Sequence, residues 1–236
     1  MAQRRSNKRK KRNKKRNELT KAVDAVITKD GKDAYFVCSY NITSEAIEEM
    51  ADRIPEEIRN QISELNFQIY NEPKEAIPKL LILRDKYPDT PILYNYLAMA
   101  YSQVRDFSAM EEVCIENYAE NPNYLFAKLN YAHMCIDRGD YEKIPEIFDN
   151  KFDLKLLYPD RYEFHVTEFE GFTGVMCIYY HKIGENDAAK LSYDSLKKVS
   201  PDSLIFKRVH KLLYPGIITR LIRKLGNKKA EHKLQA

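Results

Sequence analysis

The sequence has 236 residues, with 39 Lys and Arg, 35 Asp and Glu, 44% hydrophobic residues, seven Gly and no Trp. This length fits one domain with or without tails, and the apolar content is enough for a buried core, which excludes a chain that is disordered throughout. Seven Gly are too few for a Gly-rich phosphate-binding fold or for an all-β chain with frequent turns, so we expect helices.

The formal net charge of +4 is distributed unevenly along the chain. Residues 1–21 carry 11 Lys or Arg and one Glu, and residues 22–204 carry 19 basic and 33 acidic residues. Residues 205–236 carry nine basic residues and one acidic residue. The body is therefore acidic and both ends are basic. Charge alone directs the ends, rather than the body, toward phosphate-rich or acidic partners.

Residues 1–20 are expected to form a disordered basic tail, because their cations repel one another and bulky apolar residues are almost lacking. Two interpretations of this tail stay open. In the first, it contacts RNA or DNA phosphates or serves as a nuclear address in a eukaryote. In the second, it is an incidental solubilising tail, since it has no aromatic side chains to stack on bases. The candidate polyanion-binding residues are Arg4, Arg5, Lys8, Arg9, Lys10, Lys11, Arg12, Lys14, Lys15 and Arg16.

The cysteines and the apolar runs bear on the compartment. Four widely spaced cysteines without a CxxC motif, three of them in apolar runs, indicate buried thiols in a reducing environment. We find neither the apolar stretch of a secretory signal nor 18 consecutive apolar residues. A cytoplasmic protein without a membrane span is expected, or a nuclear one if the source is eukaryotic.

Residues 21–56 form an N-terminal segment of mixed character. A turn signal at Asp30-Gly31 and a β-leaning run at 35–38 leave its first half without a firm assignment. Ser44 is a suitable cap for a helix at about 44–52 with acids in its first turn, and Pro55 ends it.

Prolines then recur after similar short stretches of sequence, at Pro88, Pro122, Pro159 and Pro201. Each interval is long enough for two helices and two turns, which indicates an internal repeat. In residues 91–124 one helical face carries an aromatic, a Leu, a small residue and a Tyr, which are Tyr94, Leu97, Ala98 and Tyr101. A tight turn follows at Asp106-Phe107, and Pro122 closes the unit.

This unit resembles a tetratricopeptide repeat (TPR), whose pattern has these residue types at these places. Residues 125–158 match through Ala132, Gly139-Asp140-Tyr141 and Phe148, residues 170–203 through Tyr180, Gly184, Ala189, Tyr193 and Pro201, and residues 57–90 more faintly. Met110 and Lys128 depart from the pattern, and an insertion at 161–169 interrupts it. The resemblance implies an all-α fold, a right-handed α-solenoid of about four TPR-like helix pairs (57–90, 91–124, 125–158 and 170–203).

Two further segments follow the last repeat. Residues 204–214 are expected to form a capping helix with Ile205, Phe206, Val209 and Leu212 on its inner side. Pro215-Gly216 ends it, and residues 215–236 form a basic amphipathic C-terminal segment.

No catalytic or nucleotide-binding signature is present, and we expect neither an enzyme nor a cofactor. The SxxK match at Ser195 lies at a predicted helix end without partner motifs, and paired acids such as Glu168 and Glu170 are typical of solvated helix faces. Cys177 and His181 share a helix face, but two ligands do not make a metal site, so a buried thiol is favoured.

The resemblance also implies a binding groove on the concave face of the first helices of the repeats. Its residues would be Leu65, Gln68, Asn95, Met99, Ser102, Gln103, Phe126, Leu129, His133, Asp137, Ile178, His181 and Lys182. The Lys/Asn carboxylate clamp of chaperone-binding TPR proteins is not matched, which disfavours a chaperone co-factor. We therefore expect a non-enzymatic adaptor that binds a peptide or protein segment in this groove. The alternative is a nucleic-acid- or ribosome-associated factor that binds through its basic tails.

Overall fold

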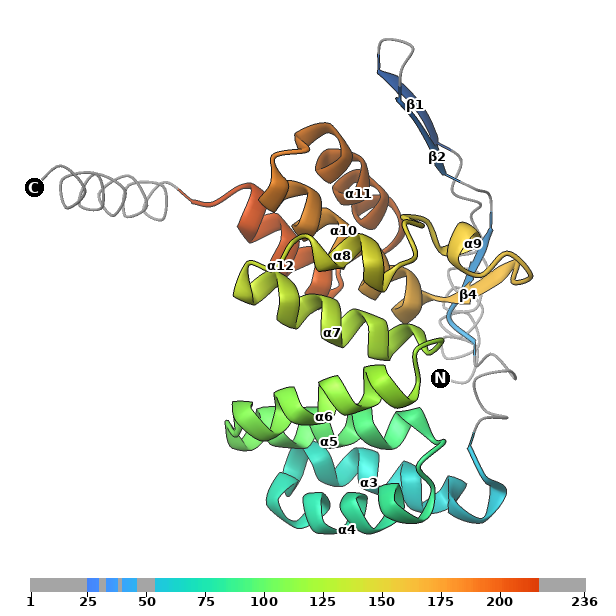
Figure 1. The fold of residues 1–236 in the computed structure, drawn as a ribbon, viewed down its shortest axis with the longest axis vertical. Helices are drawn as coiled ribbons and strands as arrows, with labels where there is room; N and C mark the ends of the chain where they lie inside the picture. The colour runs from blue at the N-terminus through green and yellow to red at the C-terminus, as the bar shows by residue number, and fades with distance from the viewer. Residues whose placement is uncertain (1–24, 30–32, 38–39, 46–53, 217–236) are drawn as a thin grey trace, which may run out of the picture.

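The structure is a computed structural model that describes residues 25–29, 33–37, 40–45 and 54–216 (Figure 1). These residues are predominantly helical, as expected. A short 3-10 helix, η2 (Glu56–Ile58), precedes ten α-helices in the described part of the chain. They are α3 (Arg59–Asn71), α4 (Pro73–Lys86), α5 (Pro91–Val104), α6 (Phe107–Glu120), α7 (Leu125–Arg138), α8 (Lys143–Ile147), α9 (Leu154–Leu157), α10 (Val166–Ile183), α11 (Asn186–Val199) and α12 (Leu204–Leu213).

Two pairs of short strands accompany the helices. β1 (Ala25–Lys29) and β2 (Asp33–Val37) are antiparallel, with Ala25 opposite Val37. β3 (Asn41–Thr43) pairs in parallel with β4 (Glu163–His165), and the opposed side chains of Ile42 and Phe164 are both buried in the core. The second pair ties the N-terminal segment to the chain ahead of α10, a contact that the sequence did not predict.

Consecutive helices pack against one another from α3 to α8 and again from α10 to α12 (Figure 1). Small side chains allow this close approach: Ala98, Ala132 and Ala189 are all buried, as expected. Gly171 and Gly174 of α10 serve the same purpose, because a Cβ there would lie 2.7 Å from Leu129 Cδ1 and 2.6 Å from Ile205 Cγ2. Helices α7 and α12 therefore both approach α10 closely.

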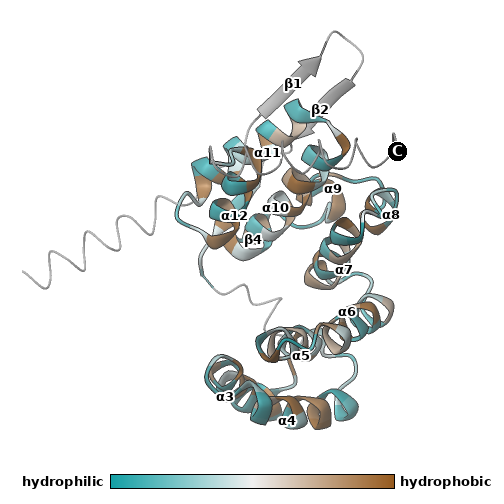
Figure 2. Ribbon diagram, turned by 90° about the vertical axis from the view of Figure 1, so that its left-hand side faces the viewer, coloured by the Kyte–Doolittle hydropathy of each residue, from teal (hydrophilic) through white to brown (hydrophobic). Residues whose placement is uncertain are grey.

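The buried side chains form two separate hydrophobic cores. One belongs to η2 and α3–α6, and the other to β3, β4 and α7–α12. Figure 2 shows the two helix groups one above the other, with α6 and α7 adjoining at the boundary. A helix, α12, is present at the position expected for the last helix. It packs Val209 into the second core, and Ser203 caps its start, since Ser203 Oγ accepts a hydrogen bond from the backbone N–H of Phe206 at 3.0 Å.

The segment after α7 departs from a regular helix pair. α8 has only five residues, because Asp149 and Asn150 adopt left-handed backbone conformations with φ of 53° and 57°. Lys128 is buried beneath this turn, and its Nζ donates a hydrogen bond to the carbonyl of Ile147 at 2.6 Å. Burial lowers the pKa of Lys128 from its ordinary value.

Several predicted features lie outside the described residues. They are the disordered tail at 1–20, most of the helix at 44–52, Cys38 and the C-terminal segment from residue 217. In the part that is described, no helix combines the length and apolar character needed to cross a membrane.

Candidate functional site

A cavity of about 1040 Å³ lies between the two helix groups. Helices α3, α5 and α6 line it from the first group, and α7 lines it from the second. The chain at 158–168 and Arg208 of α12 complete the wall. The cavity thus lies where the two hydrophobic cores adjoin.

The structure brings seven of the predicted groove residues together in this cavity: Asn95, Met99, Ser102, Gln103, Phe126, His133 and Asp137. Six others do not line it. Leu65, Leu129 and Ile178 are instead buried in the hydrophobic cores.

The remaining three lie elsewhere. Gln68 is not in the cavity wall and accepts a hydrogen bond from Lys79 Nζ at 2.9 Å. His181 and Lys182, near the end of α10, are also outside the wall. The face of α10 was assigned to the groove by resemblance, but α12 packs against this helix at Gly174 and covers part of it.

The apolar part of the cavity wall is rich in sulfur and aromatic side chains. Met99, Met110 and Met134 contribute to it together with Tyr96 and Phe126. Flexible methionines can fit partners of different shape, which rigid branched side chains cannot. Cys114 also lines the cavity, and burial raises the pKa of its thiol to about 11, with a smaller contribution from Glu111. This thiol is therefore protonated and poorly reactive at neutral pH.

His133 lies in the cavity wall as an uncharged imidazole. Burial lowers its pKa to about 4; the positive charge of Arg208 adds to this effect and Asp137 opposes it. No described residue forms a hydrogen bond with its ring nitrogens. His133 therefore offers one neutral donor and one acceptor to an occupant of the cavity at physiological pH.

A network of amide side chains connects the two helix groups beside the cavity. Asn95 Oδ1 accepts hydrogen bonds from Nδ2 of Asn117 at 3.2 Å and of Asn130 at 3.1 Å. Asn95 Nδ2 donates to the hydroxyl of Tyr124 at 3.2 Å. The network lies where α5, α6 and α7 meet, so polar bonds join the two helix groups here in addition to the stacked rings of Tyr118 and Tyr131.

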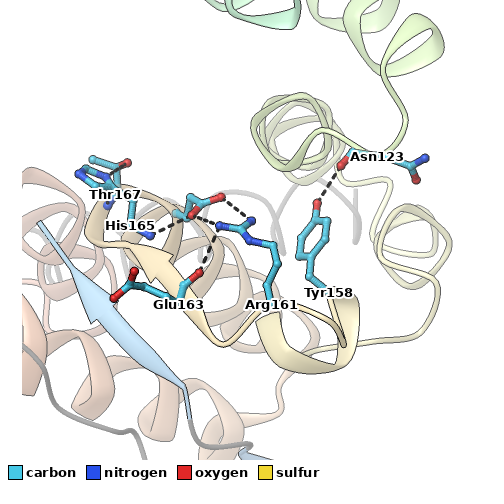
Figure 3. Close-up of polar contacts among 7 residues, drawn as sticks. Asn123, Tyr158, Arg161, Glu163, His165 and Thr167 are labelled. Atoms are coloured by element: carbon cyan, nitrogen blue, oxygen red, sulfur yellow. Dashed lines mark hydrogen bonds and ion pairs between the residues drawn. The ribbon is translucent and has the colours of Figure 1, made fainter. Parts of the chain in front are cut away.

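A further part of the cavity wall is built by the chain before α10 (Figure 3). The guanidinium of Arg161 donates to both carboxylate oxygens of Glu168, at 2.9 and 2.8 Å. Glu168 Oε2 also accepts from the backbone N–H of His165 at 2.9 Å, which caps α10. Tyr158 donates its hydroxyl hydrogen bond to the carbonyl of Asn123 at 3.1 Å, so this segment is joined to the α6–α7 turn (Figure 3).

Sequence reasoning missed this part of the cavity wall. The interpretation of Glu168 as part of a solvated face is wrong, because this side chain is buried in an ion pair. The spacing of His165 and Glu168 around the start of α10 is a capping-box signal that could have identified the acid as a helix cap. The approach of Tyr158, Arg161 and Arg208 to α7 depends on tertiary packing, for which no local pattern exists.

The expectation of buried cysteines is confirmed for the three that the structure describes. Cys114, Cys135 and Cys177 are buried and free, and the Cys177 thiol donates to the carbonyl of Ala189 at 3.2 Å. Burial raises the pKa of Cys177 to about 12. Within the described residues, no cluster of three or more His, Cys, Asp or Glu side chains is placed to hold a metal ion.

No family model, curated protein or solved structure matches this chain. What the cavity binds must therefore be argued from its own residues.

Proposed function

We propose that this protein is a non-enzymatic adaptor: a right-handed α-solenoid of about four TPR-like helix pairs that binds a peptide or protein segment in the cavity. The cavity carries the proposal, because seven residues assigned to a binding groove by resemblance line one continuous space. From here we call this space the groove.

The composition of the groove supports a peptide rather than a small charged metabolite. Its wall alternates apolar side chains such as Met99 and Phe126 with neutral hydrogen-bonding ones such as Ser102, Gln103 and His133. Peptide ligands need both, since they present apolar side chains together with amide groups. The volume of about 1040 Å³ exceeds what most drug-sized ligands occupy.

The test is affinity capture of partners by the full-length protein and by a Met99→Glu/Phe126→Glu variant. The variant is expected to lose partners that the wild type retains, because buried carboxylates oppose apolar side chains. Ile82→Glu is the matched control, since Ile82 is exposed on α4 away from the groove. Retention of every partner by a folded groove variant would place the binding surface elsewhere.

The alternative function, nucleic-acid binding through basic segments, is favoured by a separate observation. Lys197, Lys198, Lys207 and Lys211 are exposed on α11 and α12, next in the chain to the basic residues from 217 onward. Partners that disappear after nuclease treatment would support this alternative. Binding to RNA or DNA would weaken steeply with salt, and deletion of residues 1–17 would remove most of that dependence if the N-terminal tail makes the contacts.

A further inference from the structure

The groove has a direction, because α5 and α7 run the same way along it. Asn95, in the second turn of α5, is bonded to both Tyr124 and Asn130 at the beginning of α7. At the other end Arg138, which ends α7, bonds Glu111 in the first half of α6, close in the chain to the end of α5. The first turns of α5 and α7 therefore share one end of the groove, and their last turns share the other.

The charged side chains at each end largely cancel. At the end with the first turns, Arg161 is neutralised by Glu168. At the end with the last turns, Glu111 is paired with Arg138, and Asp137 and Arg208 carry opposite charges. What remains is the dipoles of α5 and α7, equivalent to roughly half a positive charge at each N-terminus and half a negative charge at each C-terminus.

The first turns of these two helices have no side-chain cap. Neither Thr90 nor Tyr124, the residues that cap α5 and α7, accepts a side-chain hydrogen bond from its helix. Pro91, Ile92, Leu125 and Phe126 of these turns all line the groove. An occupant is therefore favoured when it brings negative potential to this end and positive potential to the end beside Gln103 and Asp137.

The dimensions and the wall chemistry fit a helix. α5 and α7 have 14 residues each, which corresponds to about 21 Å along the groove. A helix of about four turns has this length and carries a dipole of its own. Met99, Met110 and Met134 give an adaptable apolar wall of the kind that receives the apolar face of an amphipathic helix. The neutral His133 adds no charge against that face.

We propose that the groove binds an amphipathic helix of about four turns, oriented antiparallel to α5 and α7, with its apolar face on Met99, Met110 and Phe126. The inference rests on the proposed function and specifies its ligand. The bound helix would bridge the two helix groups over the amide network.

The test uses two fluorescein-labelled 18-residue peptides of identical Leu, Ala, Lys and Glu composition and no net charge. One places leucines at helical spacing (i, i+3, i+4, i+7, i+11), and the other alternates them as in a strand. Anisotropy titration with the full-length protein is expected to give affinity at least about tenfold higher for the helical peptide. Met99→Glu should abolish that preference, and Ile82→Glu should preserve it. Circular dichroism verifies that each variant is folded.

Orientation is measured with a photo-crosslinking benzoylphenylalanine at either end of the helical peptide. Crosslinks from its N-terminal end should map to residues 102–111 or 133–138, and those from its C-terminal end to 91–95, 123–126 or 158–168. The reversed pattern, or tighter binding of the alternating peptide, would overturn the proposal. Binding of neither peptide would overturn it too, while groove-dependent capture of partners in the preceding experiment would leave the adaptor function standing.

Discussion

Asn130 donates a hydrogen bond to Oδ1 of Asn95 at 3.1 Å and so joins α7 to α5 across the boundary between two hydrophobic cores. The same oxygen accepts from Asn117, whose side chain is only 1% exposed. One carbonyl oxygen thus connects three helices. The two helix groups are held together by directional bonds here, which fix their relative orientation more narrowly than apolar contact does.

The first prediction concerns this oxygen. Asn95→Ala leaves Nδ2 of the buried Asn117 without its partner, so we expect the free energy of unfolding to fall by about 1–3 kcal/mol. Urea denaturation measures the change. Asn60→Ala, at an exposed position of α3, is the control and should change stability by less than about 0.5 kcal/mol. Equal stability of the two variants would show that the network contributes nothing.

The second prediction concerns the crossing of helices at Ala132. This side chain is fully buried in the second core, so Ala132→Leu should overpack it and destabilise the protein by about 1–3 kcal/mol. Ala119→Leu, on the exposed side of α6, adds the same atoms without burial. Thermal melting should separate the two variants by several degrees. An unchanged melting temperature for Ala132→Leu would contradict the close packing of α7.

The helical character of the chain and the small residues at its crossings could be predicted from sequence, because both leave local patterns. The spacing of Tyr94, Leu97 and Ala98 predicts that their side chains share one face of a helix, and all three are buried. The resemblance to TPR proteins, rather than periodicity, supplied the groove residues, and seven of the thirteen, among them Met99, Phe126 and His133, line the cavity.

The rest depended on contacts between distant segments. The pairing of Ile42 with Phe164 joins strands of three residues each, too short for a period to be recognised. The burial of Ile178 follows from the packing of α10 within the second core, including its approach to Ile205 of α12. Neither partner carries a signal in its own sequence that identifies the other.

The third prediction is a pH dependence of stability due to His133. Its pKa is about 4 in the folded chain against 6.5 ordinarily, so the unfolded chain binds the proton more readily as the pH falls from 6.5 toward 4. The protein should therefore lose stability in this window, and His133→Gln should remove part of the loss. At about pH 5 the two pKa values correspond to a loss of at most about 2 kcal/mol in the free energy of unfolding. Partial exposure of the ring to solvent makes the loss smaller.

Urea denaturation of wild type and His133→Gln at about pH 7 and pH 5 measures this effect. Arg208→Gln serves as a second probe, since removal of this charge should raise the pKa of His133 in an NMR titration. The same pH dependence in wild type and His133→Gln would mean that other groups, and not this ring, bind the protons.

The last prediction concerns Arg161 and Glu168, which hold the chain before α10 against the groove. The carboxylate of Glu168 is buried and has two functions: it pairs with the guanidinium and caps α10 through the backbone N–H of His165. Glu168→Gln keeps an oxygen for the cap but removes the negative charge that pairs with Arg161. We expect a loss of about 3 kcal/mol, since removing one member of a buried pair leaves the other charge uncompensated.

The double variant Arg161→Met/Glu168→Gln distinguishes the pair from the cap. Removing both charges should recover part of the stability that Glu168→Gln loses, and a double-mutant cycle from urea denaturation measures the coupling. Lys190→Gln is the control, because its ion pair with Asp194 is exposed and worth less than about 1 kcal/mol. If the double variant were as unstable as the sum of the two single variants, the charges would not be coupled, and the carboxylate would act only as a helix cap.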